Sequence, residues 1–537
     1  MNRSAGVAER DGVCMSAVSD PAGDGPSGAP PPGTRVVDPW LAWWCARTQR
    51  DLPRRRPVVR AMSVGEMVAG RVRSVRREMG NPLYRNAYAL MLNTVVNSGF
   101  GLLYWVFAAR VFSTEDVGRG NAMVNLMMLI SVLTSLNFGQ ALIRFLPTAG
   151  RDSRSLVRLA YGISAAMAVV GSAAVMTYCH FAYAPGDPLH VSPGFAAWFV
   201  VSTAAWSIFN LQDQVLTGLR SAMWVVLENG VYGVVKLGLL VVVAFTSVSD
   251  GVFTSWSAPV IALLVPFTLL ISRRLLPRHT AETADRDDAG APDRATLARY
   301  MGGDYLGQVF NQAMSSFLPV LVVMTISQAA SAYLLPAQTV FLAMSMLSMA
   351  ITSALVVEGS RNPAHAHVFA RAVLRRICLL VWPASLVIAL AAPLLLWFYG
   401  PQYVENSTTL LQLLMASMFP RVIVTMWMTK SRLANRTFPL AVQQLVHCAI
   451  VLGGIPLFAP MLGVDAVGWM WLAGELVLAI VFLPSVVRWL RQPVPPHPPG
   501  DGGVTTPDGP DPLDRDDDTR PIGGPEARTH EFPRVRD

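Results

Sequence analysis

Twelve long apolar stretches, each nearly empty of charge, constrain this chain more than any other feature of its sequence. A helix needs about 20 apolar residues to cross the hydrocarbon core of a bilayer, and every stretch is long enough. Hydrophobic residues make up 52% of the 537 residues and charged residues only 15%, whereas soluble domains carry about 25% charge. The sequence therefore predicts an all-α integral membrane protein and excludes a soluble globular class.

The basic residues indicate how these spans are oriented. The predicted spans lie near residues 86–112, 121–146, 156–181, 194–217, 222–248, 254–275, 300–326, 330–357, 371–398, 405–430, 437–460 and 465–490. Arginines gather in the connections that follow even-numbered spans, for example Arg273 and Arg274, and the positive-inside rule assigns such loops to the cytoplasm. We therefore expect a multi-pass membrane protein with both termini cytoplasmic. Arg110 and Arg119 depart from this asymmetry, and we expect neighbouring acids to neutralise them.

The spans form an internal duplication. A shift of 214 residues, from 311 − 97 = 214, aligns Asn97 with Asn311 and Ser113 with Ser327. Parallel repeats of this kind are typical of transporters that hold the substrate between their halves. The predicted organisation is a largely disordered cytoplasmic extension with a basic surface helix (1–85), an N-lobe of six spans (86–275), a cytoplasmic inter-lobe loop (276–299), a C-lobe of six spans (300–490) and a disordered cytoplasmic tail (491–537). A disordered basic tail is an equal alternative to the surface helix.

Corresponding spans of the two lobes carry polar stripes. One face of the first span holds Asn86, Asn93, Asn97 and Tyr104, and one face of the seventh holds Asp304, Gln308, Asn311 and Ser315. Polar groups that face lipid cost free energy, so the two stripes are expected to line a central cavity. Asn97, Gln308 and Asn311 are then candidate substrate-binding residues. The alternative is that these amides only join neighbouring helices within a lobe.

Ionisable residues inside spans are candidates for function because they are costly in lipid. By residue count Lys236, Arg421 and Glu475 lie near mid-depth, and Asp213, Glu228 and Asp304 lie in the inner half. The two cations are predicted to bind a phosphate or pyrophosphate across the central gap. The four acids are predicted to couple a proton or sodium gradient to transport. Two structural alternatives remain: Lys236 pairs with Glu228, and Glu475 neutralises Arg421.

Other chemistry is not expected. The five cysteines are scattered without metal-ligand spacing, and no glycine-rich nucleotide loop is present. His447 is interpreted as a hydrogen-bonded packing residue; the alternative is that its protonation is part of the mechanism, although no partner is evident in the sequence. No cofactor, metal site or catalytic residue is predicted. The basic residues border apolar runs, which indicates membrane lipids and not nucleic acid as the partner.

Two segments of the first lobe resemble a known family. The sequences are Phe107-Ala108-Ala109-Arg110-Val111-Phe112-Ser113-Thr114-Glu115-Asp116-Val117-Gly118 and Leu136-Asn137-Phe138-Gly139-Gln140-Ala141-Leu142-Ile143-Arg144-Phe145-Leu146-Pro147. They resemble the opening helices of bacterial O-antigen-type polysaccharide flippases, in the multidrug, oligosaccharidyl-lipid and polysaccharide exporter superfamily. The resemblance implies two six-helix lobes around a cationic cavity, with Arg144 as a cation at the cavity mouth.

The resemblance also implies a function. Members of the flippase family are expected to use an ion gradient to move an undecaprenyl-pyrophosphate-linked oligosaccharide across the membrane. Glycan-assembly proteins are expected as further partners. A multidrug or small-metabolite exporter on the same scaffold is the first alternative, although its cavity should be rich in acids. A membrane-embedded glycan polymerase or ligase is the second, although the predicted outer loops are short for a catalytic site.

Overall fold

A computed structural model describes residues 82–492, except 186, 188–189, 247–249, 284–294, 298–300, 302–304, 306–308, 311, 362–365 and 435–436. The chain divides into two units, Met1–Val75 and Arg76–Asp537, and the described residues belong to the second. The predicted basic surface helix and nearly all of the predicted tail lie outside the described residues. So do Asp304, Gln308 and Asn311 of the second polar stripe.

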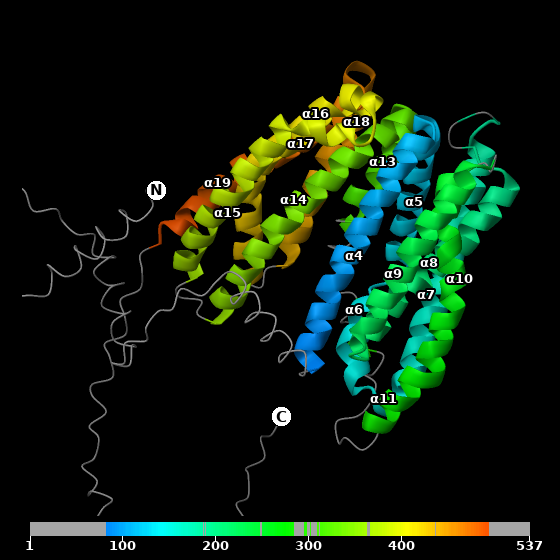
Figure 1. The fold of residues 1–537 in the computed structure, drawn as a ribbon. Coiled ribbons are helices and arrows are strands. Elements are labelled where there is room, and N and C mark those ends of the chain that lie inside the picture. Colours follow the sequence, from blue (N-terminus) through cyan, green and yellow to red (C-terminus); the bar gives the residue numbers. More distant parts are fainter. Residues whose placement is uncertain are drawn as a thin grey trace, which may run out of the picture. The chain divides into compact units, whose positions relative to one another are not determined.

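The N-lobe consists of helices that contact one another along their lengths (Figure 1). They are α4 (Pro82–Val111), α5 (Thr114–Thr134), α6 (Phe138–Phe145), α7 (Ser153–Ala182), α8 (Pro193–Gly218), α9 (Ala222–Ala244), α10 (Gly251–Leu270) and α11 (Leu276–Thr283). A π-helical turn, η3 (Ile271–Leu275), joins α10 to α11. The principal contacts are α4 with α9, α7 with α8, and α10 with both α8 and α9.

The C-lobe repeats this arrangement. Its elements are the π-helical η4 (Ala313–Phe317), α13 (Leu318–Thr325), α14 (Gln328–Arg361), α15 (Ala366–Leu390), α16 (Ala392–Trp397), α17 (Pro401–Leu433), α18 (Thr437–Leu462) and α19 (Asp465–Leu490). Within the described residues, 11 helices are long and apolar enough to span a membrane. The predicted span near 300–326 is represented by the shorter helix Ala313–Thr325, because part of that segment is not described. The all-helical, multi-pass prediction is confirmed.

Helix starts support the predicted duplication. Helix α5 begins at Thr114 and α14 at Gln328, and α10 begins at Gly251 and α19 at Asp465; the differences are 328 − 114 = 214 and 465 − 251 = 214. The amides of Asp116 and Ala330 donate to the hydroxyls of Ser113 and Ser327, each at 3.1 Å. Serine is a favoured N-cap because its oxygen accepts from a free amide in the first turn. Equivalent caps therefore start equivalent helices in the two lobes.

The predicted second span is not one continuous helix. It ends as α5 at Thr134 and resumes as α6 at Phe138, because Leu136 and Asn137 adopt left-handed conformations with φ of 46° and 64°. Asparagine tolerates this conformation, whereas leucine rarely does. Helix α6 then packs on α8, where a Cβ on Gly139 would lie 3.1 Å from the Gln214 side chain. The break thus falls within the second family-like segment.

The lobes contact each other mainly through α5 and α14. Gly118 of α5 approaches the start of α14 so closely that an added Cβ would lie 1.7 Å from the carbonyl oxygen of Gln328. One turn further on, the Asn121 amide donates to the backbone oxygen of Ser331 at 3.2 Å and to its hydroxyl at 3.3 Å. The same Cβ would lie 3.0 Å from the backbone nitrogen of Ala332, which corresponds to Gly118 under the shift because 332 − 118 = 214.

Arg110 and Arg119 are not neutralised by the acids beside them in sequence, contrary to the expectation above. Arg119 forms an ion pair with Asp250 at 2.6 Å between Nε and Oδ1. Arg110, at the end of α4, donates to the carbonyl oxygens of Trp397 at 2.5 Å and Phe398 at 2.9 Å. These carbonyls end α16, where a helix leaves its last acceptors without partners and where a cation is favoured. Arg110 therefore forms a second contact between the lobes.

Candidate functional site

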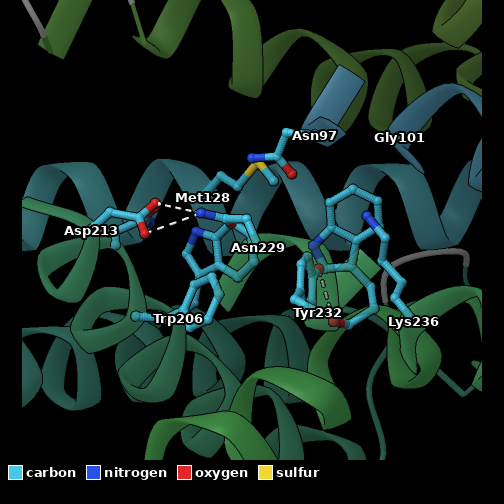
Figure 2. Close-up of a pocket in the computed structure, with 11 residues that line it drawn as sticks. Asn97, Gly101, Met128, Trp206, Asp213, Asn229, Tyr232 and Lys236 are labelled. Carbon is cyan, nitrogen blue, oxygen red and sulfur yellow. Dashed lines mark hydrogen bonds between the residues drawn. The ribbon is translucent and has the colours of Figure 1, made fainter. Parts of the chain in front are cut away.

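A pocket of about 200 Å³ lies inside the N-lobe, between α4, α5, α8, α9 and α10 (Figure 2). Its lining combines aromatic rings with amide, carboxylate and ammonium groups. The lining residues are Asn97, Gly101, Met128, Trp206, Phe209, Asn210, Asp213, Asn229, Tyr232, Lys236 and Trp256. Apolar walls with a few polar groups are typical of ligand sites.

Lys236 is the cation of this pocket. It is only 2% exposed, and its Nζ lies 3.8 Å from the ring centroid of Trp256, 4.7 Å from that of Tyr232 and 5.1 Å from that of Tyr104. Aromatic faces attract cations, and the attraction grows where water is excluded. Within the described part of the chain no carboxylate pairs with Lys236, so the predicted alternative of an ion pair with Glu228 is not what forms. The ammonium is stabilised by rings and directed into the pocket.

Hydrogen bonds fix the rings around Lys236. The Tyr104 hydroxyl donates to the Val252 carbonyl at 2.7 Å and lies 2.8 Å from the Ser255 hydroxyl, and the Tyr232 hydroxyl donates to the Trp256 carbonyl at 3.2 Å. Tyr104 is fully buried in the N-lobe. The expectation that it faces a gap between the lobes, with the rest of its stripe, is therefore wrong: its ring packs against α9 and α10.

The α4–α9 contact brings the polar stripe to the pocket. A Cβ on Gly233 would lie 2.5 Å from the Phe100 ring, so the glycine allows α4 to pack directly on α9. This packing places Asn97, one turn before Gly101, at the pocket wall, where its side chain remains exposed. Asn97, Lys236 and Asp213, three of the predicted site residues, are thus brought together.

Asp213 on α8 lines the pocket, and Glu228 on α9 immediately precedes Asn229, another lining residue. The amide nitrogen of Asn229 donates to both carboxylate oxygens of Asp213, each at 3.1 Å (Figure 2). Glu228 is fully buried, and neither of its carboxylate oxygens has a hydrogen-bond partner. Asp213 therefore faces the pocket in a fixed orientation, while Glu228 is buried without compensation.

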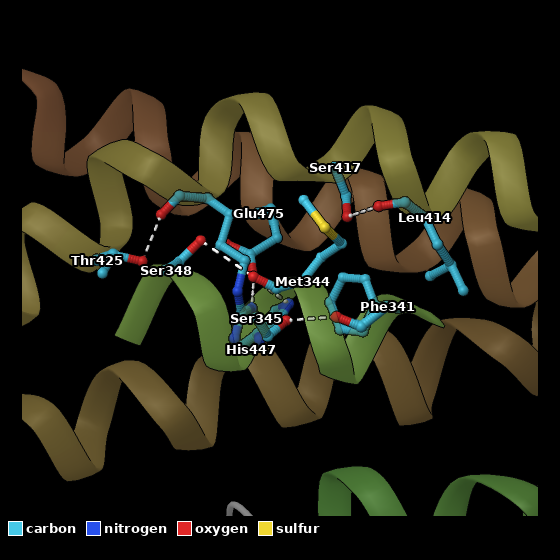
Figure 3. A network of polar contacts seen from close by, with 10 residues as sticks. Phe341, Met344, Ser345, Ser348, Leu414, Ser417, Thr425, His447 and Glu475 are labelled. Atoms are coloured by element: carbon cyan, nitrogen blue, oxygen red, sulfur yellow. Dashed lines mark hydrogen bonds and ion pairs between the residues drawn. The ribbon is translucent and has the colours of Figure 1, made fainter. Parts of the chain in front are cut away.

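The C-lobe holds a separate polar cluster (Figure 3). Arg421 on α17 donates through Nη1 to Oε1 of Glu475 on α19, and Nε2 of His447 on α18 lies 3.8 Å from the same oxygen. Glu475 is 1% exposed and the Arg421 side chain 26%. The arginine also lies over the Phe341 ring, with 5.4 Å between Cζ and the ring centroid. The predicted alternative, in which Glu475 neutralises Arg421, is the arrangement found.

The two mid-depth cations do not meet. Lys236 contacts rings of α4, α9 and α10, whereas Arg421 contacts α14 and α19, and among the described residues no interaction links them. The single cationic centre expected from the sequence is replaced by two sites, one inside each lobe. Arg144 is exposed on α6, where its guanidinium lies 5.6 Å from the ring centroid of Phe145.

Sequence reasoning missed the aromatic enclosure of Lys236. Tyr232, one turn before Lys236 on the same helix, was the only readable signal, because residues four apart share a helix face. Tyr104 and Trp256 come from other helices, so their convergence follows from packing. In the described part of the chain, no group of three or more His, Cys, Asp or Glu residues could hold a metal ion.

Solved transporters share this fold. An inward-facing multidrug resistance MATE family transporter of the MOP superfamily has a TM-score of 0.56 and 14% identity, over 75% of this chain and 98% of that chain. A MOP superfamily transporter from Pyrococcus furiosus, described as having a binding pocket of reverse polarity, has a TM-score of 0.51 and 14% identity, over 78% and 99% of the two chains. At these identities the likeness concerns the fold. No curated protein sequence matches the chain.

A match to a family model shows the family of this chain. The family described as polysaccharide biosynthesis protein matches residues 83–356, which is more than half of the chain and includes nearly all of the N-lobe and most of α14 in the C-lobe. The match covers both family-like segments and the Lys236 pocket. The chain is therefore a multi-pass membrane protein that belongs to the polysaccharide biosynthesis protein family, with the fold of MOP superfamily transporters.

Proposed function

We propose that this protein is a flippase that moves a polyprenyl-pyrophosphate-linked oligosaccharide across the bacterial cytoplasmic membrane by alternating access, for surface polysaccharide synthesis. Membership of the polysaccharide biosynthesis family supports the glycan, and the transporter fold supports movement of a substrate instead of catalysis. Both termini are proposed to be cytoplasmic, from the arginine-rich connections between spans.

The observation that carries the proposal is the buried ammonium of Lys236 at the pocket wall. The side chain is 2% exposed, its Nζ lies over three aromatic rings, and among the described residues it forms no ion pair. A buried cation without a counter-ion favours an anionic ligand, such as a phosphate group. A pocket of about 200 Å³ is small for a complete lipid-linked glycan, so it would take one charged portion of the substrate.

Pocket polarity also separates this function from multidrug export. An exporter of organic cations requires acids to attract its substrate, whereas this pocket holds Lys236 as well as Asp213, and the lysine side chain is the less exposed of the two. For the Pyrococcus furiosus transporter, the reverse polarity of its binding pocket suggests a different function. The same physical reasoning favours an anionic substrate here.

The acids of both lobes are proposed to couple ion movement to transport. Asp213 lines the same pocket as Lys236, and both carboxylate oxygens of the buried Glu228 lack a hydrogen-bond partner. A carboxylate in such a position is most stable when it binds a cation or a proton. Glu475 in the C-lobe and Asp304, which lies outside the described residues, complete the proposed set.

The test is export of surface polysaccharide in a deletion strain that expresses variants. Changing Lys236→Gln and Arg421→Gln together should abolish export per copy of protein in the membrane, a normalisation that is needed because Arg421→Gln leaves the buried Glu475 unpaired. Lys430→Gln is the matched control, because Lys430 binds the Ser485 hydroxyl at 2.9 Å at the end of α17 and lines neither site. Normal export by the double variant would refute the proposal.

A further inference from the structure

Three helices of the C-lobe place a carboxylate between two bases. Oε1 of Glu475 accepts from Arg421 and lies 3.8 Å from Nε2 of His447. The second oxygen of Glu475 has no hydrogen-bond partner, nor does Nε2 of His447, and both side chains are almost completely buried. Glu475 therefore has the capacity to bind a second donor, and His447 is the nearest group that could supply one.

The backbone of α19 is shaped to admit the imidazole at this place. A Cβ on Gly474 would lie 2.7 Å from Cδ2 and 3.0 Å from Nε2 of His447. The ring also meets Trp471 edge-on, with 5.6 Å between the ring centroids. Glycine before Glu475 thus allows the imidazole to pack against the turn that carries the carboxylate, with its Nε2 directed at Glu475 (Figure 3).

The charges of these three side chains depend on one another. Helix α18 packs on α17, α19, α13 and η4. Among the described residues of these elements, Arg421 and Glu475 are the charged groups that face His447, and α13 and η4 contain no ionisable residue. While Arg421 holds Glu475, a neutral His447 leaves the cluster uncharged. If Arg421 moves to another anion, Glu475 becomes an unpaired buried carboxylate, which is strongly unfavourable. A proton on His447 restores the balance.

We propose that Arg421 exchanges Glu475 for a phosphate group of the anionic substrate, and that His447 takes up a proton from water in the same step and pairs with Glu475. The proton binds the free lone pair of Nε2, and no bond is oxidised or reduced. The Arg421 side chain is 26% exposed and is therefore open to contact with another group, whereas Glu475 is 1% exposed. The inference rests on the proposed anionic substrate and makes His447 the site that links it to protons.

The experiment measures protons bound when inorganic pyrophosphate binds to the full-length protein in lipid nanodiscs. Calorimetry in two buffers of different ionisation enthalpy at neutral pH gives this number. The wild type should take up more protons per pyrophosphate than His447→Gln, by up to about one. Protons exchanged by pyrophosphate itself are the same in both, so they cancel in the difference.

His367→Gln is the matched control. His367 on α15 is also 3% exposed, and its Nε2 also lacks a hydrogen-bond partner, but among the described residues no carboxylate pairs with it. This variant should keep the wild-type proton number. Glu475→Gln should lose the linked proton as His447→Gln does, because the imidazolium then has no counter-ion. This variant replaces His447→Gln in the comparison if the histidine variant fails to fold.

The outcomes separate the two proposals. Equal proton numbers for the wild type, His447→Gln and Glu475→Gln, with pyrophosphate bound and export still dependent on Lys236 and Arg421, overturn the His447 inference alone. Failure of the wild type to bind pyrophosphate overturns the inference and also removes the anionic site on which the proposed function depends.

Discussion

At the scale of single residues, two buried glutamates occupy opposite surroundings. Glu475 is paired with Arg421, whereas both carboxylate oxygens of Glu228 lack a partner. Removing one member of a buried ion pair leaves the other charge uncompensated, while removing the charge of an isolated carboxylate relieves a cost. The same chemical change at these positions should therefore have opposite effects on stability.

We predict that Glu475→Gln lowers the stability of the folded protein and that Glu228→Gln does not. The loss at Glu475 should be about 1–3 kcal/mol, below the value for a fully buried pair, because water screens the partly exposed arginine. Thermal unfolding of the two variants in the same detergent at neutral pH measures the difference. An unfolding temperature for Glu228→Gln below that of Glu475→Gln would contradict this interpretation of the two sites.

The sequence indicates which residues carry buried charge but not what surrounds them. Lys236, Arg421 and Glu475 stand out because each interrupts an apolar run, and each is buried or partly buried in the structure. Their partners cannot be read in this way. Glu475 is 54 residues from Arg421, and the choice between that partner and a substrate depends on how α17 packs on α19.

At the scale of helices, the duplication was the most informative signal in the sequence. Helices α14 and α19 begin where the 214-residue shift of α5 and α10 places them. The break between α5 and α6 could not be predicted, because the apolar run continues through Leu136 and only Asn137 marks a left-handed turn. A hydrophobic pattern reports burial in lipid or protein, and it is insensitive to one irregular turn.

The closest helix contact gives a prediction at this scale. Gly118→Ala should destabilise the protein, because the new Cβ would lie 1.7 Å from the Gln328 carbonyl oxygen, in backbone that cannot rotate away. Helices α5 and α14 would have to separate. Gly162→Ala in α7 is the control: no atom lies within 4 Å of its Cβ position, and alanine is favoured over glycine in a helix by up to about 1 kcal/mol.

Thermal unfolding of both variants decides this prediction. Gly118→Ala should unfold at a lower temperature than the wild type, and Gly162→Ala at the same or a higher temperature. If Gly118→Ala is as stable as Gly162→Ala, the helices are not held at the distance described and the contact between the lobes is looser than stated.

At the scale of the whole membrane unit, the two lobes are joined at places that the proposed alternating-access cycle would have to change. Asn121 of α5 bonds Ser331 of α14, and Arg110 of α4 bonds the last carbonyls of α16. Contacts inside a lobe, such as the Ser207 hydroxyl donating to that of Ser131 at 3.0 Å, need not change when lobes move as bodies. The two kinds of contact therefore distinguish movement of lobes from movement within a lobe.

A covalent link across the lobes should stop export, and one within a lobe should not. In a variant with the five native cysteines replaced, the pair Asn121→Cys and Ser331→Cys would be oxidised in cells, and export of newly made surface polysaccharide would be followed. Export should fall on oxidation and recover on reduction, because the link holds α5 and α14 in one arrangement. The control is the pair Ser131→Cys and Ser207→Cys. Cells with this pair should continue to export when it is oxidised to the same extent, as measured by a maleimide-PEG mass shift. Equal export by both oxidised pairs would show that substrate crosses without separation of the lobes at α5 and α14.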